Sequence, residues 1–207
     1  MNHQRHTLCF LKEGAKPLSI LQKQEDELLE YWMKHQFPLI FTYQPKELHP
    51  EHVQLAIPFF DSSSQKKIRL CTNFYKNAIK ETKSLPTFQD VFQHATLKQN
   101  TEIRVYGSYC WQYLTKLNYV QPSSDLDLLI FYENQSLIEL VLYYQEIKHI
   151  LSIPRLDGEV RFPNLGDCSW FELIQPSSSA SILLKSAQQI ELISREYLYE
   201  QVPTLLA

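Results

Sequence analysis

The sequence predicts a mixed α/β (α+β) protein, in which a small N-terminal α+β unit precedes a larger domain built on a mixed sheet with flanking helices. Three observations lead to this prediction. The 207 residues are 44% hydrophobic and 21% charged, which is typical of a folded globular chain. Segments that alternate as strands do and segments with helical spacing follow one another along the chain. From about residue 88 onward, strand, turn, helix and strand patterns succeed each other closely.

The N-terminal unit is expected to span residues 1–82. Its helix is predicted over 19–35, where Leu21, Leu28 and Trp32 recur at helical spacing. Strands are expected at 7–11, 37–43 and 67–71, with a weaker fourth at 53–60. The polar and basic segment 74–85 is the expected linker to the next domain.

The second domain, residues 83–207, is expected to begin with a helix after Pro86, because Thr87 and Asp90 have the spacing of a capping box. The expected order is then a strand (102–106), a turn at Gly107-Ser108, a helix (109–117), a strand (125–132), a helix (134–152) and a hairpin (155–162 with 168–174). The apolar stripe of the second of these helices is expected to be Ile138, Val141, Leu142, Ile147, Ile150 and Leu151. The tail 181–193 fits either two short strands or one helix, and we favour a hairpin of 182–184 with 190–193.

Charge and cysteine content exclude several classes of protein. The formal charge of -3, from 20 basic and 23 acidic residues, argues against a protein whose main role is to bind nucleic acid. No apolar run approaches the ~20 residues that span a bilayer, and residues 1–12 lack the apolar segment of a signal peptide. We therefore expect a cytoplasmic protein with no membrane partner. The cysteines form no Cys-x-x-Cys pair, which favours reduced thiols over a zinc site or disulfides.

Two aspartates open an apolar strand in the segment Ser124-Asp125-Leu126-Asp127-Leu128-Leu129-Ile130. Residues i and i+2 of a strand project to the same face, so Asp125 and Asp127 should point side by side. Two carboxylates about 6 Å apart repel by roughly 3 kcal/mol at an effective dielectric of about 20. A divalent cation would reverse that sign, and carboxylates are common ligands of magnesium. The simpler alternative is a pair of solvated turn residues.

A glycine–serine turn lies upstream of the aspartates. Gly107 and Ser108 fall between an expected strand and an expected helix. The N–H groups at a helix N-terminus bind phosphate readily, and glycine allows a phosphate to approach the backbone closely. An ordinary helix cap is the alternative explanation of this pair.

A third acid lies downstream, on the next expected strand. Asp157 is placed to join the first two carboxylates, although Glu159 shares its face and fits equally; we favour Asp157. The alternative is a plain ion pair of Asp157 with Arg155 or Arg161. The order of the three pieces along the chain favours a metal-dependent phosphoryl-type transfer, which needs positioning and charge neutralisation rather than a cysteine or histidine nucleophile.

This order of motifs resembles the polymerase-β-like nucleotidyltransferase pattern, which implies a nucleotidyltransferase-type mixed sheet. The sequence resembles more closely the phosphoribosyl-dephospho-CoA transferase family of malonate decarboxylase systems. The segments that carry this resemblance are 105–112 (VYGSYCWQ), 124–129 (SDLDLL) and 154–160 (PRLDGEV), with 169–173 and 183–186 in support. The resemblance covers most of the chain and is strongest from 102 to 186.

The resemblance implies an enzyme that takes 2'-(5-triphosphoribosyl)-3'-dephospho-CoA and joins it to a serine of the acyl carrier protein subunit of malonate decarboxylase, with release of diphosphate. It implies that Asp125, Asp127 and Asp157 hold Mg²⁺ or Mn²⁺, with Asp157 either a ligand or the base that accepts the serine proton. The substrate-binding residues that it implies are Gly107, Ser108, Gln112, Ser124 and Lys185.

Several of these residues have a second interpretation. Trp111 is expected in the core rather than stacked on adenine, and Gln112 fits either a substrate hydroxyl or a backbone group as its partner. Lys185 fits a phosphate contact or a surface lysine. The basic residues Lys66, Lys67 and Arg69 fit either the carrier protein or a strand edge protected by charge.

Two rival functions remain compatible with the same residues. One is a nucleotidyltransferase that moves a nucleoside monophosphate from a common triphosphate to a small molecule or protein. The other is a non-catalytic nucleotide-binding module that retains the fold. The donor that modifies an apo-carrier protein distinguishes the first rival, and an Asp125→Ala variant with unchanged ligand response would identify the second.

Overall fold

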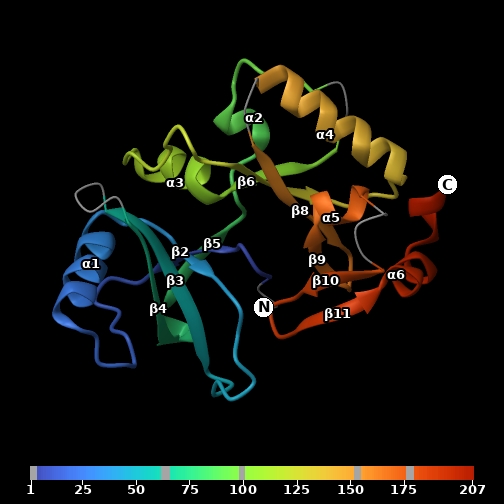
Figure 1. Cartoon of the computed structure of the whole chain (residues 1–207). Coiled ribbons are helices and arrows are strands. Elements are labelled where there is room, and N and C mark those ends of the chain that lie inside the picture. The colour runs from blue at the N-terminus through green and yellow to red at the C-terminus, as the bar shows by residue number, and fades with distance from the viewer. Residues whose placement is uncertain (1–3, 62–65, 98–100, 152–154, 176–179) are drawn as a thin grey trace. The chain divides into compact units, whose positions relative to one another are not determined.

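A computed structural model describes residues 4–61, 66–97, 101–151, 155–175 and 180–207 (Figure 1). The chain divides into two compact units, one of Met1–Leu85 with Leu114–Asn118 and one of Pro86–Tyr113 with Tyr119–Ala207. Each unit is built on its own sheet and carries helices, which confirms the predicted α+β class. Within the described residues, no helix has the length and apolar character needed to cross a membrane.

The first unit contains an antiparallel five-stranded sheet in the order β4-β3-β2-β1-β5. Its strands are β1 (Leu8–Leu11), β2 (Leu39–Phe41), β3 (His52–Asp61), β4 (Lys66–Tyr75) and β5 (Ile79–Lys83). Helix α1 (Lys23–Lys34) buries Leu29 and Trp32, and the Trp32 indole N–H donates to the Pro38 carbonyl at 2.8 Å. That bond anchors the helix to the segment that leads into β2.

Two expectations for this unit were wrong. The segment 74–85, expected as a linker, instead contains the 3₁₀ turn η1 (Lys76–Ala78) and strand β5, which pairs with β1. Its sequence reads as polar because an edge strand exposes most of its side chains. Helix α1 begins at Lys23 rather than at Ser19, because the Gln22 N–H donates to the Glu25 carboxylate and caps the helix there.

The second unit contains a six-stranded sheet in the order β11-β10-β9-β8-β7-β6. Its strands are β6 (Ile103–Tyr106), β7 (Leu126–Phe131), β8 (Leu156–Phe162), β9 (Gly166–Ser169), β10 (Ser181–Lys185) and β11 (Ile190–Ser194). All neighbouring strands are antiparallel except β7 and β8, which are parallel and are joined through helix α4 (Leu137–Leu151). The sheet is therefore mixed, as predicted.

Short helices complete this unit: α2 (Phe88–Val91), α3 (Gly107–Thr115), α5 (Trp170–Ile174), α6 (Arg195–Gln201) and the 3₁₀ turn η2 (Pro203–Leu206). The predicted capping box of α2 is confirmed. The Asp90 N–H donates to the Thr87 hydroxyl at 3.0 Å, and the Thr87 N–H donates to the Asp90 carboxylate at 2.8 Å. Hydrogen bonds to the Asp90 carboxylate from the Thr87 side chain and from the Thr87 backbone lower its pKa, because they favour the charged form.

The two faces of the second sheet differ in chemistry. One face belongs to the core and is formed by side chains that are at most 2% exposed: Leu126, Leu128, Ile130, Val160 and Phe162. Helix α5 packs against α4 on the core, where the buried Trp170 donates its indole N–H to the Leu140 carbonyl at 3.2 Å. The opposite face carries the intervening residues of the same strands, among which Asp127, Asp157, Glu159 and Arg161 are charged.

Two further expectations in this unit need correction. Helix α4 buries Leu140, Tyr143 and Ile147, whereas Ile138 and Leu142 of the predicted stripe are exposed. The helix is apolar on nearly every side, so periodicity alone does not identify the buried face. The segment 168–174 is a strand only to Ser169, whose hydroxyl accepts the Glu172 N–H and so begins α5.

The hairpin in the tail is confirmed. Strands β10 and β11 pair antiparallel over five residues, and the turn between Ser186 and Gln189 forms without a glycine. After β11, the buried Arg195 contacts the C-terminal end of α5. Its guanidinium donates to the carbonyls of Leu173 at 3.3 Å, Gln175 at 3.2 Å and Glu172. One cation thus satisfies carbonyl groups that the end of a helix leaves without partners.

Replacement of Arg195 should therefore destabilise the protein strongly. We expect R195M to lower the free energy of unfolding by about 3 kcal/mol, because several carbonyls lose a charged donor inside the protein. Chemical denaturation measures this change. The matched control R69M removes an exposed arginine that makes one 3.3 Å contact with Thr42, and it should change stability by less than about 0.5 kcal/mol. Equal effects of the two substitutions would contradict this role of Arg195.

Candidate functional site

The two parallel strands bring Asp127 and Asp157 together. Their residues are Cα partners in the β7–β8 ladder, so both side chains leave the same face of the sheet from strands about 4.8 Å apart. The approach of the strands is close next to this pair. A Cβ on Gly158 would lie 2.5 Å from the Leu128 carbonyl oxygen, so only glycine fits there. The register thus places two like charges side by side at the start of both strands.

Asp125 directly precedes β7 and is two residues from Asp127, so it lies at the same end of the sheet. The Arg155 Nε lies 2.7 Å from Asp125 Oδ1, an ion pair whose angle does not have hydrogen-bond geometry. Oδ1 is buried and accepts no hydrogen bond within the part of the chain that the structure describes. The Arg155 side chain is 69% exposed, so this contact is weakly held.

These three carboxylates fit a hard divalent cation. Mg²⁺ prefers oxygen ligands and is commonly held by one or two carboxylates together with substrate phosphates. Asp125 Oδ1 already lies 2.7 Å from the Arg155 guanidinium, so a metal ion would replace that contact. Asp125, Asp127 and Asp157 would supply carboxylate oxygens to such an ion, although these oxygens do not all lie within 4.8 Å of one another in the structure.

Gly107 sets the position of Asp127. The Asp127 side chain packs directly against Gly107: a Cβ on Gly107 would lie 1.8 Å from Asp127 Oδ2. Its φ of +64° is also in the left-handed region, which favours glycine. Helix α3 begins at this residue, so its first N–H groups lie beside the carboxylate. The helix starts two residues earlier than expected and therefore includes Gly107 and Ser108 rather than following them.

Asp157 has its own fixed surroundings. Its Oδ1 accepts the Gly158 N–H at 2.7 Å. Tyr144 of α4 donates its hydroxyl to the Leu156 carbonyl at 3.1 Å, one residue before the aspartate. Burial raises the pKa of Tyr144, and the negative charge of Asp157 raises it further. Tyr144 is thus a neutral neighbour of Asp157, held in place by its ring contact with Trp170.

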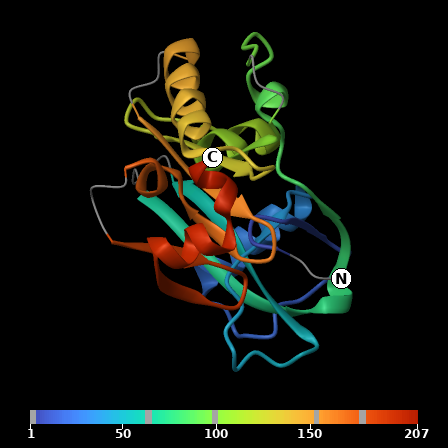
Figure 2. The same cartoon turned by 90° about the vertical axis from the view of Figure 1, so that its right-hand side faces the viewer.

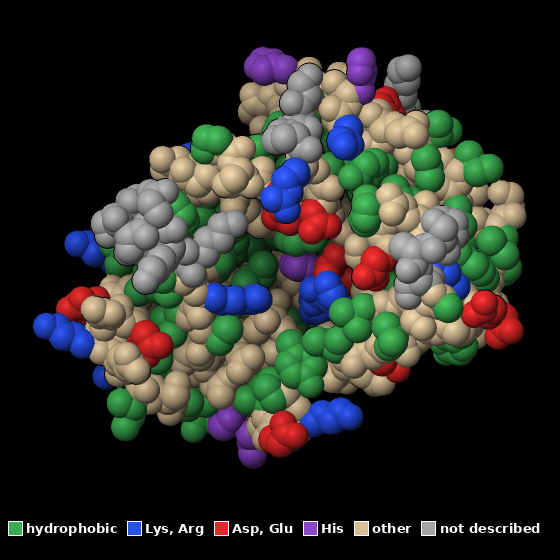
Figure 3. Space-filling view, viewed as in Figure 1, with side chains coloured by type: hydrophobic (Ala, Val, Ile, Leu, Met, Phe, Trp, Pro, Cys, Tyr) green, Lys and Arg blue, Asp and Glu red, His purple; other side chains and the backbone are tan. Residues whose placement is uncertain are grey.

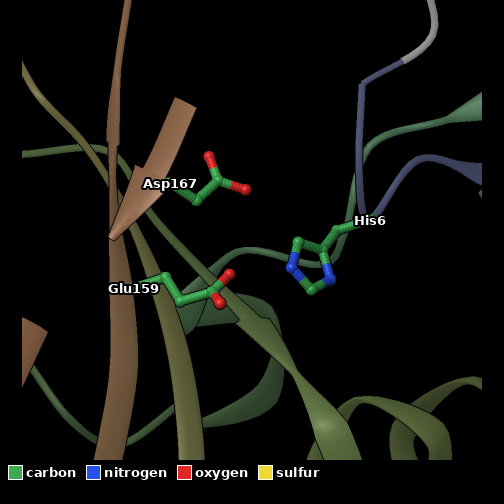
Figure 4. Close-up of side chains that lie close together, drawn as sticks. All are labelled: His6, Glu159 and Asp167. Carbon is green, nitrogen blue, oxygen red and sulfur yellow. The ribbon is translucent and has the colours of Figure 1, made fainter. Parts of the chain in front are cut away.

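Further along the same face, charges are paired with one another. Lys185 Nζ lies 2.8 Å from Glu159 Oε1, and the Arg161 guanidinium contacts both oxygens of Asp167 at 2.6 and 2.8 Å. Glu159 and Asp167 project from β8 and β9 on the same side in Figure 4, which also draws His6 of the first unit. Figure 3 likewise shows acidic side chains next to lysines and arginines. Arg155 thus pairs with Asp125, and Arg161 pairs with Asp167.

The ladder distinguishes the two acids that the sequence left as alternatives. Asp157 is the register partner of Asp127, whereas Glu159 is the partner of Leu129, one step of the pleat away. Glu159 is also 5% exposed and in contact with Lys185. The register therefore places Asp157, and not Glu159, directly opposite Asp127.

The remaining residues that the sequence singled out lie around the same strands. Trp111 is buried in the core, as expected. The Gln112 side chain accepts the Val120 N–H at 3.0 Å, so it holds a backbone group of the loop before β7. The Ser124 hydroxyl accepts the Gln121 N–H at 2.9 Å and is also engaged in that loop. Arg69 is exposed, and the side chains of Lys66 and Lys67 lie outside the described residues.

Sequence reasoning missed two residues of this site. Tyr144 stood in an apolar helix with no motif around it, so no local signal pointed to its position beside Asp157. Asp167 occurred in the expected turn of a hairpin, and its bidentate contact with Arg161 follows only from the β8–β9 register. The opposite charges of Arg161 and Asp167, one on each strand of the hairpin, are the signal from which the β8–β9 register could have been predicted.

Comparison with known proteins gave consistent matches. A family model described as the C-terminal domain of the phosphoribosyl-dephospho-CoA transferase MdcG matches residues 75–196, which include all three aspartates. A phosphoribosyl-dephospho-CoA transferase of Xanthomonas axonopodis pv. citri (strain 306) is 28% identical over 94% of this chain and 96% of its own. One of Bradyrhizobium diazoefficiens is 25% identical over 92% of this chain and 90% of its own. No solved structure matched the chain.

The carboxylate pair generates a prediction about stability. We expect D127N to remove a repulsion between two carboxylates, which is roughly 3 kcal/mol for charges ~5 Å apart at a dielectric of about 20. Mg²⁺ should raise the melting temperature of the unsubstituted protein and leave that of D127N unchanged. Thermal melts with and without Mg²⁺ measure both. A D127N protein that Mg²⁺ still stabilises would remove Asp127 from the metal site.

Gly107 generates a second prediction. We expect G107A to lose the response to Mg²⁺ and to lower the free energy of unfolding by about 1–2 kcal/mol, because a methyl group strains the backbone and displaces the Asp127 carboxylate. The control G14A changes another glycine with positive φ, where no atom lies within 4 Å of the added Cβ. It should share the backbone strain but retain the response to Mg²⁺.

Proposed function

The chain belongs to the phosphoribosyl-dephospho-CoA transferase family, and from this premise we propose that it attaches a prosthetic group to a carrier protein. The donor in this proposal is 2'-(5-triphosphoribosyl)-3'-dephospho-CoA. The acceptor is a serine of the acyl carrier protein subunit of malonate decarboxylase. The observation that supports the proposal best is the register pairing of Asp127 with Asp157 at the shared start of two parallel strands, with Asp125 two residues before Asp127.

The reaction is a substitution at the phosphorus that carries the ribose. The serine Oγ forms a bond to that phosphorus, and the bond from the phosphorus to the bridging oxygen of the leaving diphosphate breaks. The product is a phosphodiester, and the serine proton must leave the oxygen during attack. Such transfers depend mainly on positioning and on neutralising charge, for which a cluster of carboxylates next to helix N–H groups is suited.

The residues have separate roles in this proposal. Asp125 and Asp127 would hold Mg²⁺ or Mn²⁺, which when bound neutralises charge on the triphosphate. The N–H groups at the start of α3 and the Ser108 hydroxyl face phosphate oxygens, where the partial positive charge of the helix end favours an anion. Asp157 completes the carboxylate set or accepts the serine proton.

The other residues support the site from nearby. Gln112 and Ser124 hold the loop that leads into β7, so they position Asp125 rather than contact the donor. The Lys185 ammonium group is paired with the Glu159 carboxylate. To contact a phosphate in this proposal, it must exchange that carboxylate for the triphosphate. Basic residues near Arg69 on β4 would meet an acidic carrier protein.

Transfer can be tested with purified apo-carrier and separate donors. The protein is incubated with Mg²⁺, the carrier and either the triphosphoribosyl donor or a common nucleoside triphosphate, and the intact mass of the carrier is measured. We expect the mass to rise by the phosphoribosyl-dephospho-CoA group with the first donor only. A carrier modified by nucleoside triphosphates alone would favour a nucleotidyltransferase of different specificity, and no modification under any donor would favour a binding module.

Substitution of the third acid provides a matched comparison within this assay. We expect D157N to lower the transfer rate by about 10²–10⁴-fold, the range that a positioned acid–base group contributes. The control E159Q alters a carboxylate two residues away on the same face and should lower the rate less than tenfold. Single-turnover transfer rates of D157N and E159Q measure this difference, as the ratio of the two losses. A larger loss from E159Q would assign the third acid to Glu159.

A further inference from the structure

Strand β11 differs from the other three sheet edges that the structure describes. On the outer edge of β4, the Asn73 carbonyl accepts the Leu18 N–H at 2.8 Å. On the outer edge of β6, the Val105 N–H donates to the Pro86 carbonyl at 2.9 Å. The edge strand β5 carries Lys80, Glu81 and Lys83, charges of the kind that protect an edge. Among the described residues, nothing pairs with the outer edge of β11.

The side chains of β11 do not protect it either. The strand reads Ile-Glu-Leu-Ile-Ser, with one charge and no proline or lysine. Ile190 is 55% exposed and Leu192 is 69% exposed. An open edge strand with exposed apolar side chains is a template for pairing with another strand. Figures 1 and 2 show β11 in red at the end of its sheet.

The hairpin bonds determine which backbone groups of β11 point outward. The Ser186 N–H donates to the Gln189 carbonyl, and the Arg195 N–H donates to the Ala180 carbonyl, so these bonds mark both ends of the β10–β11 ladder. Hydrogen-bonded pairs alternate along an antiparallel ladder. Glu191 and Ile193 therefore bond inward to β10. The N–H and C=O groups of Ile190, Leu192 and Ser194 point outward.

We propose that β11 pairs antiparallel with β11 of a second copy of this chain, about a twofold axis at Leu192. In this register Leu192 faces its own equivalent, and Ile190 faces Ser194 of the other copy. All outward backbone groups of these three residues then form hydrogen bonds across the axis. The surface is self-complementary, as a twofold interface requires. The two sheets become one continuous sheet.

Charge selects this register over its neighbours. Here Glu191 lies opposite Ile193 of the second copy. A slip that centres the axis on Glu191 would place two carboxylates directly opposite each other, and like charges in that position are destabilising. A slip in the other direction, centred on Ile193, would direct the pairing toward Arg195, where β11 ends and α6 begins. A one-strand interface is small, so the dimer should dissociate on dilution in the micromolar range.

Self-association is measured by sedimentation velocity of the full chain over a range of concentrations. The mass should rise with concentration from 24.5 kDa toward twice that value. L192P removes an outward N–H that the hairpin does not use, so the protein should fold while its dimerisation weakens at least tenfold. The control I68K changes another exposed apolar residue, on β4, and should dimerise as the unsubstituted protein does.

A charge-swap experiment tests the register itself. L192K and L192E should each be monomeric, because each places like charges opposite each other at the axis, and a mixture of the two should form a heterodimer. A chain that stays monomeric at every concentration overturns the proposal. So does a dimer that L192P leaves intact. If L192P instead impairs only transfer to the carrier, the edge binds the carrier and not a second copy.

Discussion

The candidate site depends on one electrostatic constraint: the in-register alignment of Asp127 with Asp157 across the parallel strands β7 and β8. Two like charges at the spacing of adjacent strands repel each other, so a positive charge beside them would favour this arrangement. The neighbouring structure serves this alignment. Gly158 allows the strands to approach, Gly107 leaves room for a carboxylate, and the start of α3 presents N–H groups beside it.

The sequence was sufficient to predict the elements around the site because local signals were strong there. The alternation in β6 and β7, the Thr87–Asp90 capping box and the C-terminal hairpin all appear in the structure. The cysteines, expected as reduced thiols, are free, with Cys71 exposed and the others buried. The family likeness agrees with the comparisons because its motifs include glycines and aspartates whose geometry few other residues can replace.

Other features could not be predicted because they arise from contacts between distant segments. Helix α4 has apolar residues on nearly every side, so the position of Trp170 against Leu140, and not the helical period, decides which face is buried. Strand β5 lies at an edge, where exposed polar side chains hide the strand pattern. The pairing of Glu159 with Lys185 joins residues 26 positions apart and depends on the order of strands in the sheet.

The connection through α4 has a consequence for the order in which the protein folds. The hairpins β8–β9 and β10–β11 join segments that are close in sequence and can form early, whereas β7 meets β8 only after the whole of α4 has been placed. The carboxylates come together in that late, non-local step. A nascent chain that lacks β8 therefore cannot yet bring Asp157 opposite Asp127, and the candidate site forms only once β8 has been made.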